Sequence, residues 1–193
     1  MSFDPAKVPG GDVGCWGDEC QGKALAALAD ADWRGVYEWT KSWVGWGGGA
    51  WLPGVWLLYA TSGLLHRQPK TAVHTLDMGL QTWIEGPSDR AALTWGRGVL
   101  VWRYLNDPKT ALIDMEAAAG HVPGWFEKDV LTQVEACRDA ARASRKRVPT
   151  VKARPDLAPP STGRDFVAPP VGDHVDGARP TMWDAVAGYF AVP

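Results

Sequence analysis

Cysteine is scarce in this sequence, and it forms no dense, even set of the kind that holds small secreted domains together. The 193 residues contain three cysteines, Cys15, Cys20 and Cys137. A small secreted fold stapled by disulfides carries more of them, in pairs. The first residues also lack the apolar run of a signal peptide. Both absences favour the reducing cytoplasm, and we expect the protein there.

The sequence also lacks an excess of charge of either sign. Its 20 basic and 22 acidic side chains give a formal net charge of -2. No field of the whole molecule therefore attracts nucleic acid or anionic lipid. A basic run over 138–154 could touch phosphates, but a favourable interaction with a helix C-terminus explains it better. Neither nucleic acid nor a membrane is an expected partner.

One stretch, 43–65, has no charged side chain and calls for a membrane test. Gly47, Gly48 and Gly49, followed by Pro53, would break a spanning helix near its middle. What remains is an apolar helix of the length expected in a protein core. The sequence therefore predicts no membrane span here.

Catalytic motifs are missing as well. The sequence contains no GxSxG, HExxH, P-loop or dinucleotide fingerprint. Asp114 and Glu116 share a predicted helix but point about 200° apart, so they cannot form an acid and base pair. Cys15 and Cys20 could be ordinary thiols, a small disulfide, or a metal or redox pair, but no Cys or His nearby completes a zinc site. We predict no catalytic residue, no metal site and no cofactor.

Tryptophan, in contrast, is abundant, with 12 residues. Apolar residues recur at helical spacing over most of the chain, and proline or aspartate marks several helix starts. Together these signals predict an all-α protein with about seven helices. The expected starts are near Lys23, Trp33, Pro53, Pro69, Ser88, Pro108 and Pro123, and the last helix runs to Arg145.

Composition divides the chain into three parts. Residues 1–19 are glycine-rich and irregular, residues 20–146 carry the helical pattern, and residues 147–193 form a proline-rich, irregular tail. One segment of the tail, near 180–190, has the anchor spacing of a helix that docks on another surface. Its anchors at i, i+3, i+4 and i+7 are Trp183, Val186, Ala187 and Phe190. We expect it to dock on the same chain or on a neighbouring copy.

An internal repeat organises the helical part. The segment 68–73, QPKTAV, returns 39 residues later as 107–112, DPKTAL, and Trp56 aligns with Trp95. A fixed period of this size is typical of stacked helical units. With these positions the chain resembles the tetratricopeptide repeat family, although its period is longer than the usual 34 residues. The family's conserved positions fall on Trp95, Trp102, Ala111, Met115, Ala118 and Pro123.

The resemblance implies stacked antiparallel helical hairpins with a concave surface lined by the first helix of each hairpin. In that family such a surface binds an extended peptide or a short helix. Here the lining helices would lie near 21–29, 53–66 and 89–105. We therefore predict a non-catalytic scaffold or adaptor that binds a protein or peptide partner. The expected partner-binding residues are Arg67, Arg90, Arg97, Arg103, Trp56 and Trp95.

Three other interpretations remain open. The arginines could simply be solvated surface charges. The chain could be an all-α enzyme or small-molecule-binding protein, with a pocket lined by tryptophans and His66 or His121 as polar groups. It could also be a structural subunit of a larger assembly, in which the tail reaches a neighbour. The tryptophans of the pocket alternative are Trp43, Trp51, Trp56 and Trp95.

Overall fold

Helices make up all the regular structure of the parts of the chain that the computed structural model describes. These parts are residues 16–82, 84, 86–126, 128–144, 176–177, 179–180 and 183–193. Within them there is no strand, which confirms the all-α class. The predicted irregular segment 1–19 and most of the proline-rich tail lie outside the described residues.

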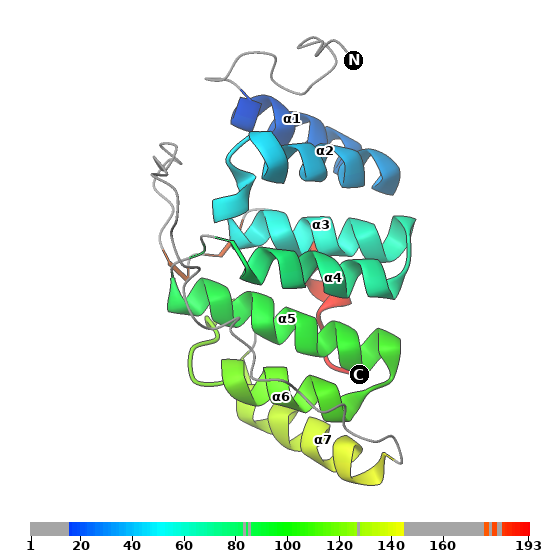
Figure 1. Cartoon of the computed structure of the whole chain (residues 1–193), viewed down its shortest axis with the longest axis vertical. Coiled ribbons are helices and arrows are strands. Elements are labelled where there is room, and N and C mark those ends of the chain that lie inside the picture. The colour runs from blue at the N-terminus through cyan, green and yellow to red at the C-terminus, as the bar shows by residue number, and fades with distance from the viewer. Residues whose placement is uncertain are drawn as a thin grey trace.

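Seven helices follow one another along the molecule, and each packs mainly on the next one in sequence (Figure 1). A short eighth helix near the C-terminus packs on the third. The helices are α1 (Trp16–Ala29), α2 (Trp33–Trp46), α3 (Pro53–His66), α4 (Pro69–Leu80), α5 (Pro87–Leu105), α6 (Pro108–Ala118), α7 (Val130–Ala143) and α8 (Trp183–Val186). Two 3₁₀ turns, Gly49–Trp51 and Ala187–Tyr189, complete the described elements.

Proline opens four of these helices, because its fixed φ suits the first helical position and its missing N–H is not needed there. Pro69 begins α4 and Pro108 begins α6, so the two similar six-residue segments are both helix starts, as predicted. Asp107 caps α6 by accepting a hydrogen bond from the Thr110 N–H at 3.3 Å.

Three predicted boundaries were wrong. Helix α1 begins at Trp16 rather than near Lys23, and α5 begins at Pro87 rather than after a cap at Ser88. Helix α7 begins at Val130, because Asp129 caps it by accepting from the Thr132 N–H at 3.3 Å. The residues after Pro123, where we expected this helix to start, form a turn instead.

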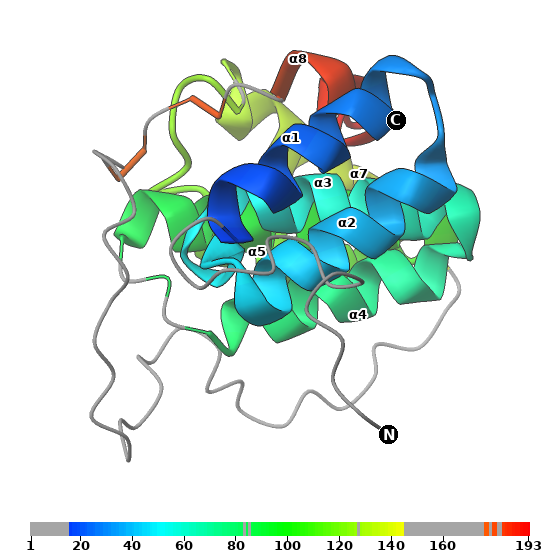
Figure 2. The same ribbon diagram turned by 90° about the horizontal axis from the view of Figure 1, so that it is seen from above.

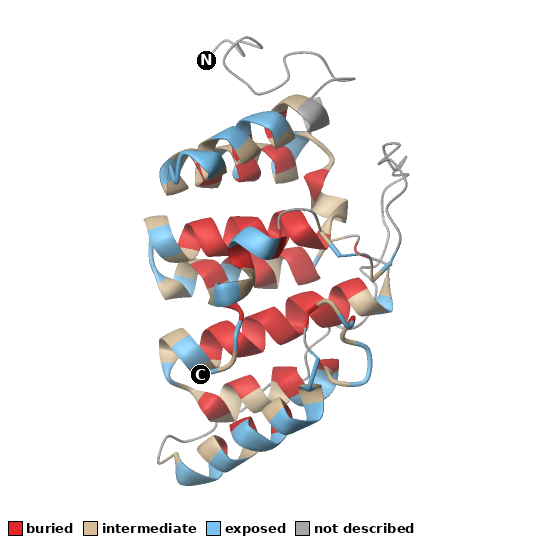
Figure 3. Cartoon of the chain, turned by 180° about the vertical axis from the view of Figure 1, so that it is seen from behind, coloured by how far each residue is buried: buried red, intermediate tan, exposed pale blue. Residues whose placement is uncertain are grey.

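The core is built around α3 and α5, the two helices with the longest buried runs (Figure 3). Every residue of α3 from Pro53 to Gly63 is buried, and so is every residue of α5 from Asp89 to Val101. A helix that is buried all round needs cover on every side. The neighbouring helices provide part of that cover, and the C-terminal segment provides another part.

Trp56 and Trp95, which align in the repeat, are both buried in this core. Trp56 donates its indole N–H to the carbonyl of Ala50 at 3.0 Å. Its ring lies so close to Gly79 that a Cβ there would come within 2.8 Å of it. The indole N–H of Trp95 has no hydrogen-bond partner among the described residues.

The uncharged stretch 43–65 is split between the end of α2, the 3₁₀ turn Gly49–Trp51 and α3. Among the described helices, none combines the length and the apolar character that crossing a bilayer requires.

The two tryptophans give a paired test of this core. Trp56→Phe loses a buried hydrogen bond, whereas Trp95→Phe removes a buried polar group that has no partner. We expect Trp56→Phe to lower the free energy of unfolding by about 1 kcal/mol more than Trp95→Phe does. Urea unfolding of the two variants measures the difference. Equal losses would contradict the hydrogen-bond assignment.

Candidate partner-binding site

The described residues of the C-terminal stretch 176–193, here called the docked segment, lie against α3 and α5. Viewed from behind, the segment crosses α3 and runs toward α5 (Figure 3). Seen from above, its helix α8 lies at one edge of the molecule, with α4 at the opposite edge (Figure 2). We call the surface that it covers the α3–α5 face.

Three of the four predicted tail anchors are buried in this contact. Trp183, Val186 and Phe190 are 5%, 0% and 2% exposed, and Ala187 is half-buried. Full burial of side chains of this size contributes about 1.5–3 kcal/mol each. The segment is therefore held mainly by its side chains, because a helix as short as α8 is not stable alone.

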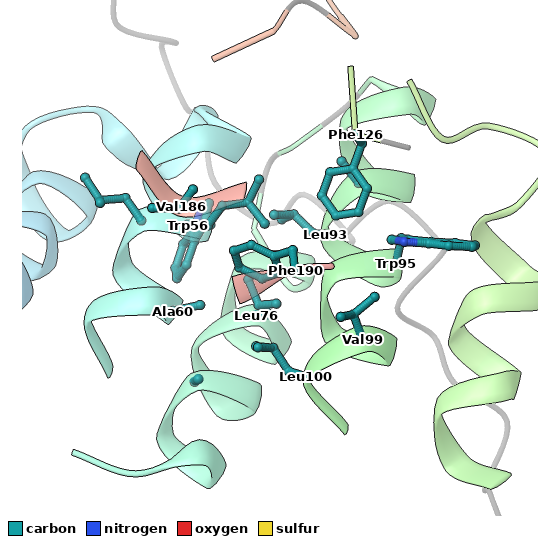
Figure 4. Packing of buried hydrophobic residues seen from close by; sticks show 14 of the residues in the cluster. Trp56, Ala60, Leu76, Leu93, Trp95, Val99, Leu100, Phe126, Val186 and Phe190 are labelled. Atoms are coloured by element: carbon teal, nitrogen blue, oxygen red, sulfur yellow. The ribbon is translucent and has the colours of Figure 1, made fainter. Parts of the chain in front are cut away.

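Phe190 occupies a seat formed by Gly96 of α5 and Leu57 of α3. Figure 4 shows its ring in the core cluster that also contains Leu76 and Leu93. A Cβ on Gly96 would lie 3.2 Å from Leu57 and 3.3 Å from the Phe190 ring. Even the Cβ of an alanine would require these neighbours to move by a few tenths of an ångström. Gly96 thus fixes how closely the docked segment can approach α5.

Aromatic rings from the turn after α6 complete the contact. The Trp183 ring lies 4.9 Å from both the Trp125 and the Phe126 ring, and the Phe126 ring lies 6.2 Å from that of Phe190. These separations and the tilted or edge-on geometries are the ones that aromatic rings prefer. The cluster ties the turn to the docked segment.

The start of α5 is capped by a residue from the docked segment. Gly86 occupies the N-cap position and has no side chain to offer. Asp176 supplies the missing acceptor, because its carboxylate receives the N–H of Asp89 at 3.0 Å. A Cβ on Gly86 would lie 2.2 Å from that carboxylate oxygen. Glycine at position 86 is therefore required for Asp176 to reach the helix.

Gly177 strengthens this connection through its main chain. Its N–H donates to the Asp89 carboxylate at 3.1 Å, and its carbonyl accepts from the Trp125 indole N–H at 2.9 Å. The residue has φ +73°, a left-handed conformation that glycine adopts without strain. An Asp-Gly turn thus fastens one end of the docked segment.

The other end is held at the last turn of α5. Arg103 donates to the carbonyls of Gly188 and Ala191, and the Tyr104 hydroxyl donates to the Tyr189 carbonyl at 3.3 Å. The Tyr189 ring also meets the Trp33 ring edge-on, with centroids 6.1 Å apart. Among the arginines predicted to bind a partner, Arg103 therefore contacts the docked segment.

Two of the arginines predicted to bind a partner are not exposed at the surface, as direct contact with a partner would require. Arg90 and Arg97 are only 7% and 4% exposed. Arg90 donates to the main-chain carbonyls of Ile84 and Leu80, at 3.2 and 2.9 Å. Both residues lie on α5, where burial all round leaves no solvent-facing side for a charge.

Arg97 joins three helices through carboxylates. It binds Asp114 of α6 through two parallel hydrogen bonds, 2.8 and 2.9 Å long, and also contacts Asp77 of α4. Asp114 is 2% exposed and Asp77 is 41% exposed. Burial lowers the pKa of the Arg97 guanidinium, but the two carboxylates outweigh it and raise that pKa above its ordinary value. Arg97 is a structural cation rather than a partner contact.

The remaining predicted site residues are dispersed. Arg67 is exposed at the end of α3, 3.9 Å from the Glu38 carboxylate and over the Tyr37 ring. Trp56 and Trp95 are core residues and do not reach the surface. The six residues therefore do not form one patch.

Groups that could support chemistry are also separate. His66 ends α3 beside the Tyr37 ring, and His121 is exposed in the turn after α6. Cys20 and Cys137 are free and buried, and burial raises their thiol pKa values to about 11 and about 12. Cys15 lies outside the described residues. Within the described parts, no three His, Cys, Asp or Glu side chains gather as a metal site would require.

Comparison of the chain with protein-family models, with curated proteins and with solved structures finds no match in any of the three. The site is therefore defined by its own geometry. Sequence reasoning missed Gly86, Asp176, Gly177, Trp125 and Phe126. Two signals in the sequence could have indicated them. Asp176-Gly177, ahead of the aromatic anchors, is a typical turn pair, and Gly86 before Pro87 leaves a helix start without a side-chain cap.

Loss of the buried cation gives a test of the core around the site. Arg97→Met removes the guanidinium that binds the buried Asp114 carboxylate, and we expect the free energy of unfolding to fall by about 3–5 kcal/mol. Arg142→Ala, which removes an exposed pair with Asp139, is the control and should change little. Denaturant unfolding measures both. A small loss for Arg97→Met would contradict the structural role.

A serine at position 86 tests the cap that comes from the docked segment. Serine normally improves an N-cap, but here its Cβ would displace Asp176. We expect Gly86→Ser to speed hydrogen exchange at the Gly177 amide by about tenfold or more. This corresponds to a fall of about 1.4 kcal/mol in the free energy of local opening at this contact. Gly120→Ser is the control, because a Cβ there meets nothing within 4 Å.

The same substitution should change sign when Asp176 is absent. In the Asp176→Ala background, serine meets no carboxylate and supplies its own cap, so Gly86→Ser becomes neutral or stabilising. Thermal unfolding of the single and double variants completes the cycle. Additive effects would show that the two positions do not interact.

Proposed function

We propose that this protein is a non-catalytic helical-repeat adaptor, resembling tetratricopeptide repeat proteins, that binds a partner protein or peptide in the cytoplasm. The 39-residue period supports the repeat architecture, since Pro69 and Pro108, which align at this offset, each begin a helix. Aligned positions also share their environment. Trp56 and Trp95 are both buried, as are Ala72 and Ala111.

The observation that carries the proposal is the docked segment itself. The α3–α5 face receives a short helix through apolar anchors, and hydrogen bonds hold both ends of the docked segment that carries this helix. This is the way in which helical scaffolds bind short amphipathic helices from partners. A face with these properties is suited to peptide recognition, and neither a metal nor a cofactor is needed for it.

Cross-linking of the tagged full chain in its native cells tests the adaptor function. We expect one protein to co-purify in comparable molar amount, with cross-links to α1, α3, α5 or the docked segment. A variant with Gly96→Leu, which fills the Phe190 seat, should lose most of that partner. Gly22→Leu is the matched control, since a Cβ at position 22 meets nothing within 4 Å.

Circular dichroism first confirms that both variants keep the helical content of the parent chain. A chain that purifies alone, or a partner retained equally by both leucine variants, would count against binding at this face. Turnover of a small molecule by the purified chain would favour the enzyme alternative instead.

A further inference from the structure

Most of the hydrogen bonds between the docked segment and the stack use groups of the segment that any short peptide could offer. Five of its hydrogen-bonding groups are main-chain atoms, namely the N–H and carbonyl of Gly177 and the carbonyls of Gly188, Tyr189 and Ala191. Main-chain recognition is independent of the peptide's sequence. Among the contacts described here, Asp176 is the one side chain of the segment that bonds to the stack.

Specificity comes from the three buried anchors. Trp183 and Phe190 enter the aromatic cluster and the Gly96 seat, and Val186 lies between them with no exposed surface. The residues on the other side of the segment, Asp184, Ala185 and Gly188, are exposed. The face therefore recognises two aromatic side chains and one aliphatic side chain at a fixed spacing, and it does not contact the exposed side chains between them.

The contacts also follow the whole length of α5. Asp89 in its first turn holds Gly177, Gly96 in its middle seats Phe190, and Arg103 and Tyr104 in its last turn hold residues 188–191. A binding site with two polar ends and an apolar centre accepts a ligand of defined length. The docked segment fills all of it.

We propose that residues 176–193 are a displaceable intramolecular ligand of the α3–α5 face, and that they compete with a partner's short helix carrying an aromatic residue, an aliphatic residue three positions later and a second aromatic residue seven positions later. This inference rests on the proposed adaptor function and adds its regulation and the chemistry of its ligand. Because the segment belongs to the same chain, its effective concentration at the face is high, on the order of millimolar. A free peptide can bind only to chains whose face is open. Its apparent affinity is therefore the intrinsic affinity multiplied by the small open fraction.

Binding of a synthetic peptide of residues 176–193 to the full chain tests the proposal. Fluorescence anisotropy of the labelled peptide is measured with the parent chain, with Trp183→Ala/Phe190→Ala, and with Asp176→Ala. These substitutions weaken the docking of the chain's own segment and change no residue of the receiving face. We expect the double variant to bind the peptide at least tenfold more tightly than the parent, and Asp176→Ala to lie between them. The control Ala185→Ser, at an exposed position, should match the parent.

The peptide carries the second half of the test. Peptides with Trp183→Ala or Phe190→Ala should lose binding to the double variant, and a peptide with Ala185→Ser should keep it. Circular dichroism shows whether each chain keeps its helices. Loss of helical content in both Asp176→Ala and the double variant would overturn the proposal, because the stack would then require the segment in order to fold.

Failure of this inference is distinguishable from failure of the adaptor function. A folded double variant that binds no peptide would make the segment a permanent part of the core, while cross-linking could still identify a partner elsewhere on the stack. Sedimentation of the parent chain measures its oligomeric state and so tests whether the occupant of the face comes from a second copy. Dimerisation that the double variant abolishes would assign the face to the partner copy's segment and overturn the competing-helix proposal.

Discussion

Burial of α3 and α5 on all sides is the constraint on which the rest of the molecule depends. Neighbouring helices cover these two helices in the stack, but one side of each remains for the residues of the C-terminus to cover. Leaving this apolar face exposed to water would cost free energy. The face is therefore more stable with an occupant, and replacing one occupant by another is easier than leaving the face empty.

The same constraint explains why the arginines Arg90 and Arg97 of α5 bind acceptors inside the protein. An arginine in a helix without a solvent side must find acceptors inside the protein. Arg90 uses main-chain carbonyls, and Arg97 uses the carboxylates of Asp114 and Asp77. The triad of Arg97 connects α4, α5 and α6, so it also fixes how these helices are spaced behind the α3–α5 face.

Local signals predicted most of the helices, since proline and aspartate act on the residues next to them. The starts at Pro53, Pro69 and Pro108 follow from such signals, and the spacing of Trp183, Val186 and Phe190 indicated a docking segment. The arginines were placed wrongly because a charge is normally read as facing solvent, and periodicity carries no information in a helix buried all round. The start of α7 was missed because Trp125 and Phe126 are used in the aromatic cluster instead. The pairing of Asp176 with Gly86 could not be predicted, because it joins residues that are far apart in the sequence and leaves no local pattern.

This pairing has a consequence for the order in which the molecule is completed. Ribosomes make the chain from the N-terminus, so α5 and its uncapped Gly86 emerge well before Asp176 is translated. Until then the first turn of α5 lacks its acceptor, and the seat beside Gly96 lacks Phe190. A nascent stack thus exposes the face throughout the synthesis of the intervening residues, and that interval is when a chaperone or an early-arriving helix meets the least competition.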